Sequence, residues 1–119
     1  MVTDNIKLPE IARAQQNLSA PPSPSHGMVV TSDQKTLLVN SRLNTTLYAY
    51  SLPDLKLKGG AALSGKGAEW LTITPDDKTA YVANAHTNNV SVVDIASMKE
   101  VALIPVGFAP ARNVAWIAP

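Results

Sequence analysis

The sequence contains no cysteine and few aromatic residues, and both absences restrict what the protein can be. Without cysteine the chain forms no disulfide bonds, no thiolate metal sites and no covalent c-type haem attachment, which requires a Cys-x-x-Cys-His run. Aromatic residues make up 5% of the 119 residues, whereas hydrophobic residues make up 45%. The length suits one domain, and its core is expected to be aliphatic.

Strong charge and long apolar runs are also missing. A net charge of +1, with no large block of either sign, argues against a nucleic-acid-binding surface. No apolar run is long enough to span a bilayer, so we expect no membrane span. The residues from Met1 to Asp4 do not begin an export signal. As written, the chain is expected to stay in the cytoplasm unless its true N-terminus lies upstream.

The feature that organises the chain is an internal repeat. Residues 74–94 read as a turn, a strand, a polar loop and a second strand, with turn residues at Pro75, Asp76 and Asp77. Residues 31–39 align with residues 74–82 without a gap, at a period of 43. Periods of about 40–45 residues are typical of four-stranded propeller blades. The sequence therefore predicts an all-β fold of four-stranded antiparallel propeller blades.

The repeat also predicts where each strand lies. Residues 26–68 and 69–111 form two complete blades, and residues 112–119 begin a third. The strands of these units are expected at residues 27–31, 36–40, 46–51 and 55–63, then at 70–74, 79–83, 89–94 and 99–106, and finally at 114–117.

Residues 1–25 differ from the repeats. Ile11, Ala14 and Leu18 follow Pro9 at helical spacing, which predicts a short helix within residues 9–18. The Pro- and Ser-rich run after it reads as an extended connector. Two interpretations remain open, a loose lead-in and the remnant of an outer strand and loop from a preceding blade.

Apolar residues point to both faces of the predicted strands, as Val92 and Val93 illustrate. Such a sheet must be covered on both sides, and propellers achieve this by closing a ring of four to eight blades. Two repeats are too few. Either the chain is a piece of a longer one, or copies associate through their blade faces towards a ring of three or four chains, or the isolated chain aggregates.

Two stretches carry a resemblance to a known family. Tyr81-Val-Ala-Asn84 with Asn89-Val-Ser-Val-Val-Asp94, followed by Ile104-Pro-Val-Gly107, resembles the Tyr-Val-Thr-Asn repeat family of bacterial and archaeal propellers. The first repeat matches less well, with Leu38-Val-Asn-Ser41 in place of the motif. The resemblance covers about residues 24–119 and implies a seven- or eight-bladed ring, usually exported to the periplasm or cell surface. Similar propellers occur in haem-bearing nitrite reductase, quinone-dependent amine dehydrogenases and some lactonases.

Topology selects three candidate binding residues. His26, Glu69 and Arg112 lie one period apart, and each precedes a first strand. If first strands line the ring axis, these side chains meet at the mouth of the central channel. The alternatives are that His26 bonds a neighbouring loop and that Glu69 and Arg112 form an ion pair between blades. The loop on the same face adds three further candidates, Asn84, His86 and Asn88.

No residue pattern demands catalysis. Trp70 and Trp116 are expected to pack. Gly65-Lys66-Gly67 lacks the strand-then-helix context of a phosphate loop, which argues against nucleotide binding. We predict no bound cofactor and no metal. The sequence favours a non-catalytic module that acts as a scaffold or as a surface for a protein or ligand. The alternative is part of a periplasmic propeller oxidoreductase, linked to haem or quinone, or of a lactonase-like enzyme.

Overall fold

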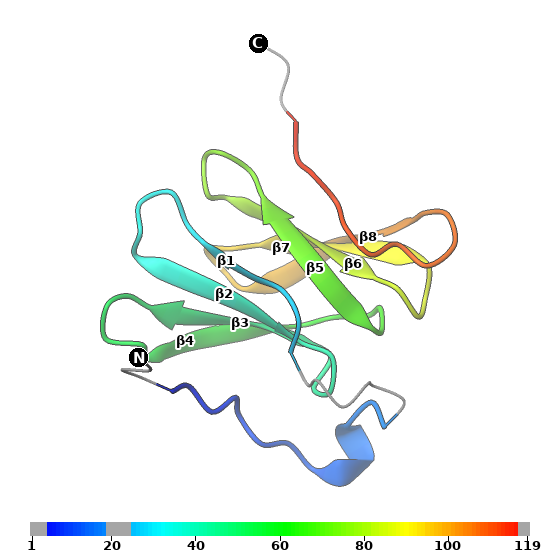
Figure 1. Cartoon of the computed structure of the whole chain (residues 1–119), viewed down its shortest axis with the longest axis horizontal. Helices are drawn as coiled ribbons and strands as arrows, with labels where there is room; N and C mark the ends of the chain where they lie inside the picture. The colour runs from blue at the N-terminus through cyan, green and yellow to red at the C-terminus, as the bar shows by residue number, and fades with distance from the viewer. Residues whose placement is uncertain (1–4, 19–24, 117–119) are drawn as a thin grey trace.

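The computed structural model describes residues 5–18 and 25–116, and their regular structure is almost entirely β-strand (Figure 1). Two four-stranded antiparallel sheets follow each other along the chain, each with its strands in sequence order. The first, called blade 1, contains β1 (Met28–Val30), β2 (Thr36–Ser41), β3 (Thr46–Ser51) and β4 (Leu57–Ala62). The second, blade 2, contains β5 (Ala68–Ile73), β6 (Thr79–Asn84), β7 (Asn89–Asp94) and β8 (Lys99–Pro105). This confirms the predicted all-β fold of two antiparallel blades.

Two expected elements take another form. The short helix expected within residues 9–18 is replaced by a single 3-10 turn, η1 (Arg13–Gln15), with no regular structure in the rest of residues 5–18. Residues 112–116 form no strand, although one was expected at 114–117; Ile117 lies outside the described residues. A first strand pairs with the second strand of its own blade, and no such partner is available to residues 114–116 in the described chain.

The turns repeat with the same period as the strands. Three pairs of non-glycine residues with positive φ lie one period apart, namely Gln34 with Asp77, Thr45 with Asn88, and Leu55 with Met98. Left-handed backbone is rare outside glycine, so its recurrence fixes the same chain reversals in both blades. The two blades therefore share the backbone conformation of these turns as well as the sequence repeat.

The main core lies between the two blades. Leu38 and Leu47 of blade 1 are fully buried against Leu71, Val82 and Val93 of blade 2. Each blade thus covers one face of the other, as the apolar residues on both strand faces require. This places a shared layer in the middle and leaves one outer face on each blade.

The outer face of blade 1 is partly covered by the N-terminal residues. Ile6 and Leu8 pack against Val39, Tyr48 and Tyr50, and the blue segment runs beside blade 1 in Figure 1. Burial raises the pKa of the Tyr50 phenol, with a smaller contribution from Tyr48. Within the described residues the lead-in is a packed part of the fold, which differs from the loose lead-in considered above.

The turns on one side of the molecule join the two blades. The Asp77 carboxylate accepts hydrogen bonds from the Ser32 amide at 2.9 Å and the Ser32 hydroxyl at 2.6 Å. These bonds hold the pKa of Asp77 below its usual value of 3.8, the hydroxyl having the larger effect. The carboxylate of Asp33, which lies nearby, opposes the shift.

The lowered pKa of Asp77 makes the stability of the fold depend on pH. A carboxyl whose folded pKa is depressed contributes stability above its unfolded pKa and loses it as the pH falls through the folded value. We expect the urea midpoint of the wild type to fall between about pH 5 and about pH 1, and that of Asp77→Asn to fall less. Asp33, Asp76 and Asp94 also have lowered pKa values, so the variant should retain part of the dependence. Parallel curves for the two proteins would contradict the role of Asp77.

Candidate functional site

A β-bulge positions two of the residues at the predicted channel mouth. In β5 the register shifts between Ala68 and Leu71, so Glu69 and Trp70 together lie opposite Ala83 of β6. Bulges redirect side chains and occur often beside functional sites. The bulge brings Glu69 and Trp70 to the junction with blade 1, next to His26.

His26 and Glu69, which occupy the same position of successive repeats, are in contact. The His26 Nδ1 lies 2.7 Å from the Glu69 backbone oxygen and 3.5 Å from the Glu69 carboxylate. The ring of His26 also meets the edge of Trp70, with the ring centroids 6.1 Å apart. The histidine is therefore held by the neighbouring blade, while its side chain remains 44% exposed.

The ion pair of Glu69 is formed with a residue that sequence reasoning missed. Arg42, in the connection from β2 to β3, donates from Nη2 to the Glu69 carboxylate at 2.5 Å. The Arg42 side chain is only 7% exposed and that of Glu69 20%. The expected ion pair between Glu69 and Arg112 is not formed among the described residues. The signal available in the sequence was the meander topology, which brings the β2–β3 connection to the same face as Glu69.

Arg112 joins the group through an aromatic contact. Its guanidinium carbon lies 5.5 Å from the centroid of the Trp70 ring, within the range of a cation–π interaction. Trp70 thus contacts two of the three predicted residues, His26 and Arg112, and it directly follows the third, Glu69. We call His26, Arg42, Glu69, Trp70 and Arg112 the channel-mouth cluster.

An amide inside the junction fixes the backbone beneath this cluster. The Asn40 side chain is fully buried, accepts bonds from the amides of His26 and Gly27, and donates to the Glu69 carbonyl at 3.1 Å. A Cβ at Gly27 would lie 3.0 Å from the backbone of Glu69 and Trp70. Only glycine permits the two chains to approach so closely here. The cluster is thus built on a rigid base.

The three loop candidates have contacts of another kind. Asn84 is fully buried and donates to Asn89 and Ser91, while the Asn88 side chain accepts from the Ala109 amide at 2.9 Å. The His86 ring packs over Gly67, whose φ is +76°. In residues 25–116, none of the contacts described for Asn84, His86 and Asn88 reaches the channel-mouth cluster. These three residues stabilise the loops of blade 2.

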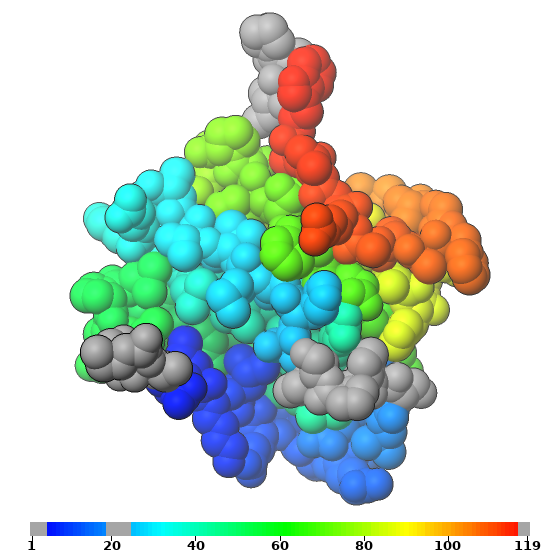
Figure 2. All heavy atoms as spheres, viewed as in Figure 1, coloured from blue at the N-terminus to red at the C-terminus, as the bar shows by residue number. Residues whose placement is uncertain are grey.

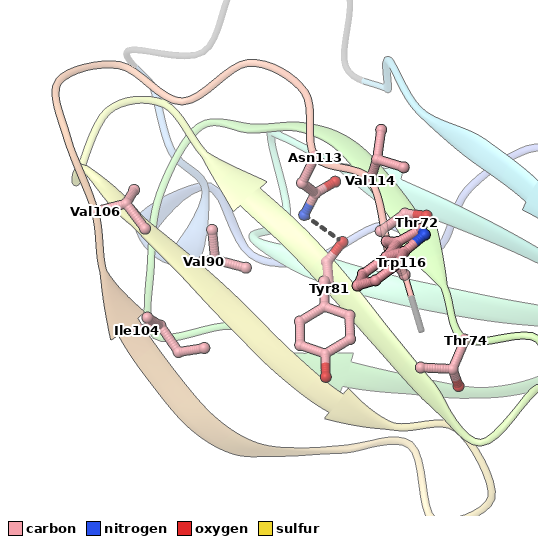
Figure 3. Close-up of a pocket in the computed structure, with 10 residues that line it drawn as sticks. Thr72, Thr74, Tyr81, Val90, Ile104, Val106, Asn113, Val114 and Trp116 are labelled. Atoms are coloured by element: carbon pink, nitrogen blue, oxygen red, sulfur yellow. Dashed lines mark hydrogen bonds between the residues drawn. The ribbon is translucent and has the colours of Figure 1, made fainter. Parts of the chain in front are cut away.

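A separate cleft lies on the outer face of blade 2. It has a volume of about 340 Å³, and Tyr81, Val90, Ile104 and Trp116 are among its lining residues (Figure 3). The Asn113 side chain donates to the Tyr81 carbonyl at 3.0 Å and anchors the terminal segment across this face. Trp116 was expected to pack but is 79% exposed, and its segment projects from the body of the molecule (Figure 2).

The described residues contain neither a candidate metal site nor a candidate membrane-spanning helix. Residues 5–18 and 25–116 contain no group of three or more histidine, aspartate or glutamate side chains placed to hold a metal ion. The same residues form no helix long and apolar enough to cross a membrane.

The chain is similar to several proteins of known structure. No family model and no curated protein sequence matches the chain. Hydrazine synthase from Kuenenia stuttgartiensis is 28% identical over 82% of this chain and 28% of its own, with a TM-score of 0.71. Apo AztD from Citrobacter koseri is 17% identical with a TM-score of 0.64, covering 76% of this chain and 26% of its own.

A third structure is the dihydro-heme d1 dehydrogenase NirN in complex with DHE. It is 22% identical with a TM-score of 0.63, over 74% of this chain and 19% of its own. The chain therefore spans less than a third of each of these structures. The likeness to AztD and NirN concerns the fold alone. Together with the two antiparallel sheets, the matches identify the fold as a pair of propeller-type blades.

Proposed function

We propose that the chain is a non-catalytic β-propeller repeat module, a scaffold whose blades pack side by side and whose second blade accepts a further one. The repeat period carries this proposal. Blade 2 covers a face of blade 1 that includes Leu38, Leu47, Ala61 and Leu63. One period later, the same positions in blade 2 are Tyr81, Val90, Ile104 and Val106, which line the cleft of Figure 3.

The equivalent positions are apolar or aromatic in both blades but differ in how far they are covered. Ala61 is 1% exposed and Leu63 is 7% exposed, whereas their equivalents Ile104 and Val106 are 43% and 40% exposed. An apolar face built like a buried one, yet open, marks an interaction surface. In this proposal the parent protein is a ring of seven or eight blades of the Tyr-Val-Thr-Asn repeat type, exported from the cell. The channel-mouth cluster then offers loop-borne side chains to a ligand or protein.

An apolar dye tests the open face directly. Dyes such as ANS fluoresce on exposed apolar surface, so the folded wild type should enhance the signal. Ile104→Asp places a charge in the cleft and should remove most of the enhancement. Val101→Asp is the matched control, because Val101 lies at the bulge of the same strand and is 63% exposed. Equal signals from the two variants would mean that the cleft is not the open face.

The second candidate function is that the chain forms part of a propeller oxidoreductase. The 28% identity to hydrazine synthase favours it. His26 fits one ligand position of a haem, because its Nδ1 is held by the Glu69 carbonyl and its Nε2 has no hydrogen-bond partner among residues 5–18 and 25–116. A bound haem or quinone would supply redox chemistry, and His26 would orient it. An absorbance spectrum of the purified protein from the near-ultraviolet to the red separates the candidates. A cofactor band that His26→Ala abolishes would favour the oxidoreductase.

A further inference from the structure

The N-terminal residues occupy a surface that the repeat assigns to a blade. We call residues 5–17 the strap. Ile6 and Leu8 lie on the outer face of blade 1, and the Asn44 side chain donates to the Pro9 carbonyl at 2.7 Å. The Asn17 amide donates to the Leu43 carbonyl at 2.8 Å and holds the other end. The strap is therefore held by the apolar side chains of Ile6 and Leu8 near its start, and by hydrogen bonds at Pro9 and Asn17 further along.

The face beneath the strap matches the docking face of blade 2. Blade 2 presents Leu71, Ala80, Val82 and Val93 to blade 1. One period earlier, the same positions in blade 1 are Met28, Leu37, Val39 and Tyr50. The strap covers this face incompletely, because Met28 is 56% exposed and a cleft of about 320 Å³ remains between the strap and the sheet.

We propose that two copies of the chain associate head to tail, with blade 1 of one copy leaving its strap and docking on the outer face of blade 2 of the other. The inference rests on the proposed function and names the partner of that face. A second copy fits because it carries the face that completes the interface already present inside the chain. The strap competes with the incoming copy, so the apparent affinity is reduced by the fraction of chains with the strap released.

The polar contacts predict that this association is weak and reversible. Inside the chain the junction has two clamps, Ser32 with Asp77 and Ser64 with Glu100. At the junction between copies, the serine positions become Pro75 and Gly107, and the acidic positions become Gln34 and Leu57. Neither clamp can form there. The junction between copies therefore keeps the apolar contact surface of the junction inside the chain but lacks both of its hydrogen-bonded clamps.

Sedimentation velocity over a concentration series tests the role of the strap. Ile6→Asp with Leu8→Asp should release the strap and lower the dissociation constant by about tenfold or more. Ala12→Asp with Ala14→Asp adds the same charge at exposed strap positions and should leave it unchanged. Adding Ile104→Asp to the released variant should abolish association. Association equal in the two strap variants would overturn the inference.

A complementation experiment tests the direction of assembly without touching the strap. One copy carries Pro75→Ser with Gly107→Ser, and the other carries Gln34→Asp with Leu57→Glu. All four positions are exposed, and a Cβ at Gly107 would meet nothing within 4 Å, so both proteins should fold. Only the mixture rebuilds both clamps, and it should associate about tenfold more tightly than either protein alone.

The outcomes separate this inference from the proposed function. A mixture no tighter than its components, with association still lost in Ile104→Asp, means that blade 2 faces pair with each other. That result overturns the head-to-tail arrangement and leaves the scaffold proposal standing. No association in any variant also overturns the inference. If Ile104→Asp in addition leaves dye binding unchanged, the scaffold proposal fails with it.

Discussion

Replacing Leu71 by Ala is expected to lower the free energy of unfolding by about 3 kcal/mol, because it opens a cavity in the layer between the blades. Leu71 is fully buried and belongs to the cluster that both blades share. Neighbouring side chains cannot collapse into the space without separating the two sheets. Urea denaturation followed by tryptophan fluorescence measures the loss.

The repeat supplies a matched control for this variant. Met28 occupies the same position in blade 1 but is 56% exposed, since the strap covers that face only in part. Met28→Ala should therefore cost less than about 1 kcal/mol, as expected where little apolar area is removed from contact. Similar losses at the two positions would mean that the layer between the blades is not the main source of stability.

The strands were predictable because their pattern is local and occurs twice. The third strands were expected at residues 46–51 and 89–94, and β3 and β7 have those bounds. Each contains alternating or β-branched residues between polar turns, a pattern that identifies strands well. The fourth strand of blade 1 begins two residues later than expected, at Leu57, because Leu55 adopts a left-handed conformation that ends the turn.

The N-terminal residues were not predictable from local spacing. Ile11, Ala14 and Leu18 have helical spacing, yet only a 3-10 turn forms near them. The apolar anchors are instead Ile6 and Leu8, which lie two residues apart in an extended segment and pack on the same face of blade 1. Tertiary burial overrides a weak helical preference in so short a segment.

For the channel-mouth cluster, the repeat predicted which residues share an equivalent backbone position but not how their side chains pair. The shared period placed His26 and Glu69 together and brought Arg112 to the same ring. It could not show that a different arginine reaches the Glu69 carboxylate, because that depends on the path of the β2–β3 connection across the junction. A repeat defines equivalent backbone positions, whereas the choice of ion-pair partner depends on side chains that differ between the repeats.

This buried ion pair gives the second large effect. Glu69→Ala would leave the Arg42 guanidinium in the junction without its carboxylate, and the Arg42 Nε already has no hydrogen-bond partner among the described residues. Removing one member of a buried pair costs about 3–5 kcal/mol, because the remaining charge is desolvated and unpaired. Since Glu69 keeps some solvent contact, we expect a loss of about 3 kcal/mol in the free energy of unfolding.

Two comparisons separate the charge from the packing. Glu10→Ala removes the carboxylate from an exposed pair with Lys7, whose side chains are 83% and 78% exposed, and should cost at most about 1 kcal/mol. Arg42→Met combined with Glu69→Leu removes both charges and keeps the volume, so it should recover most of the stability lost in Glu69→Ala. A double variant as unstable as Glu69→Ala would show that the hydrogen bonds of the pair, and not the unpaired arginine, hold the two blades together at this point.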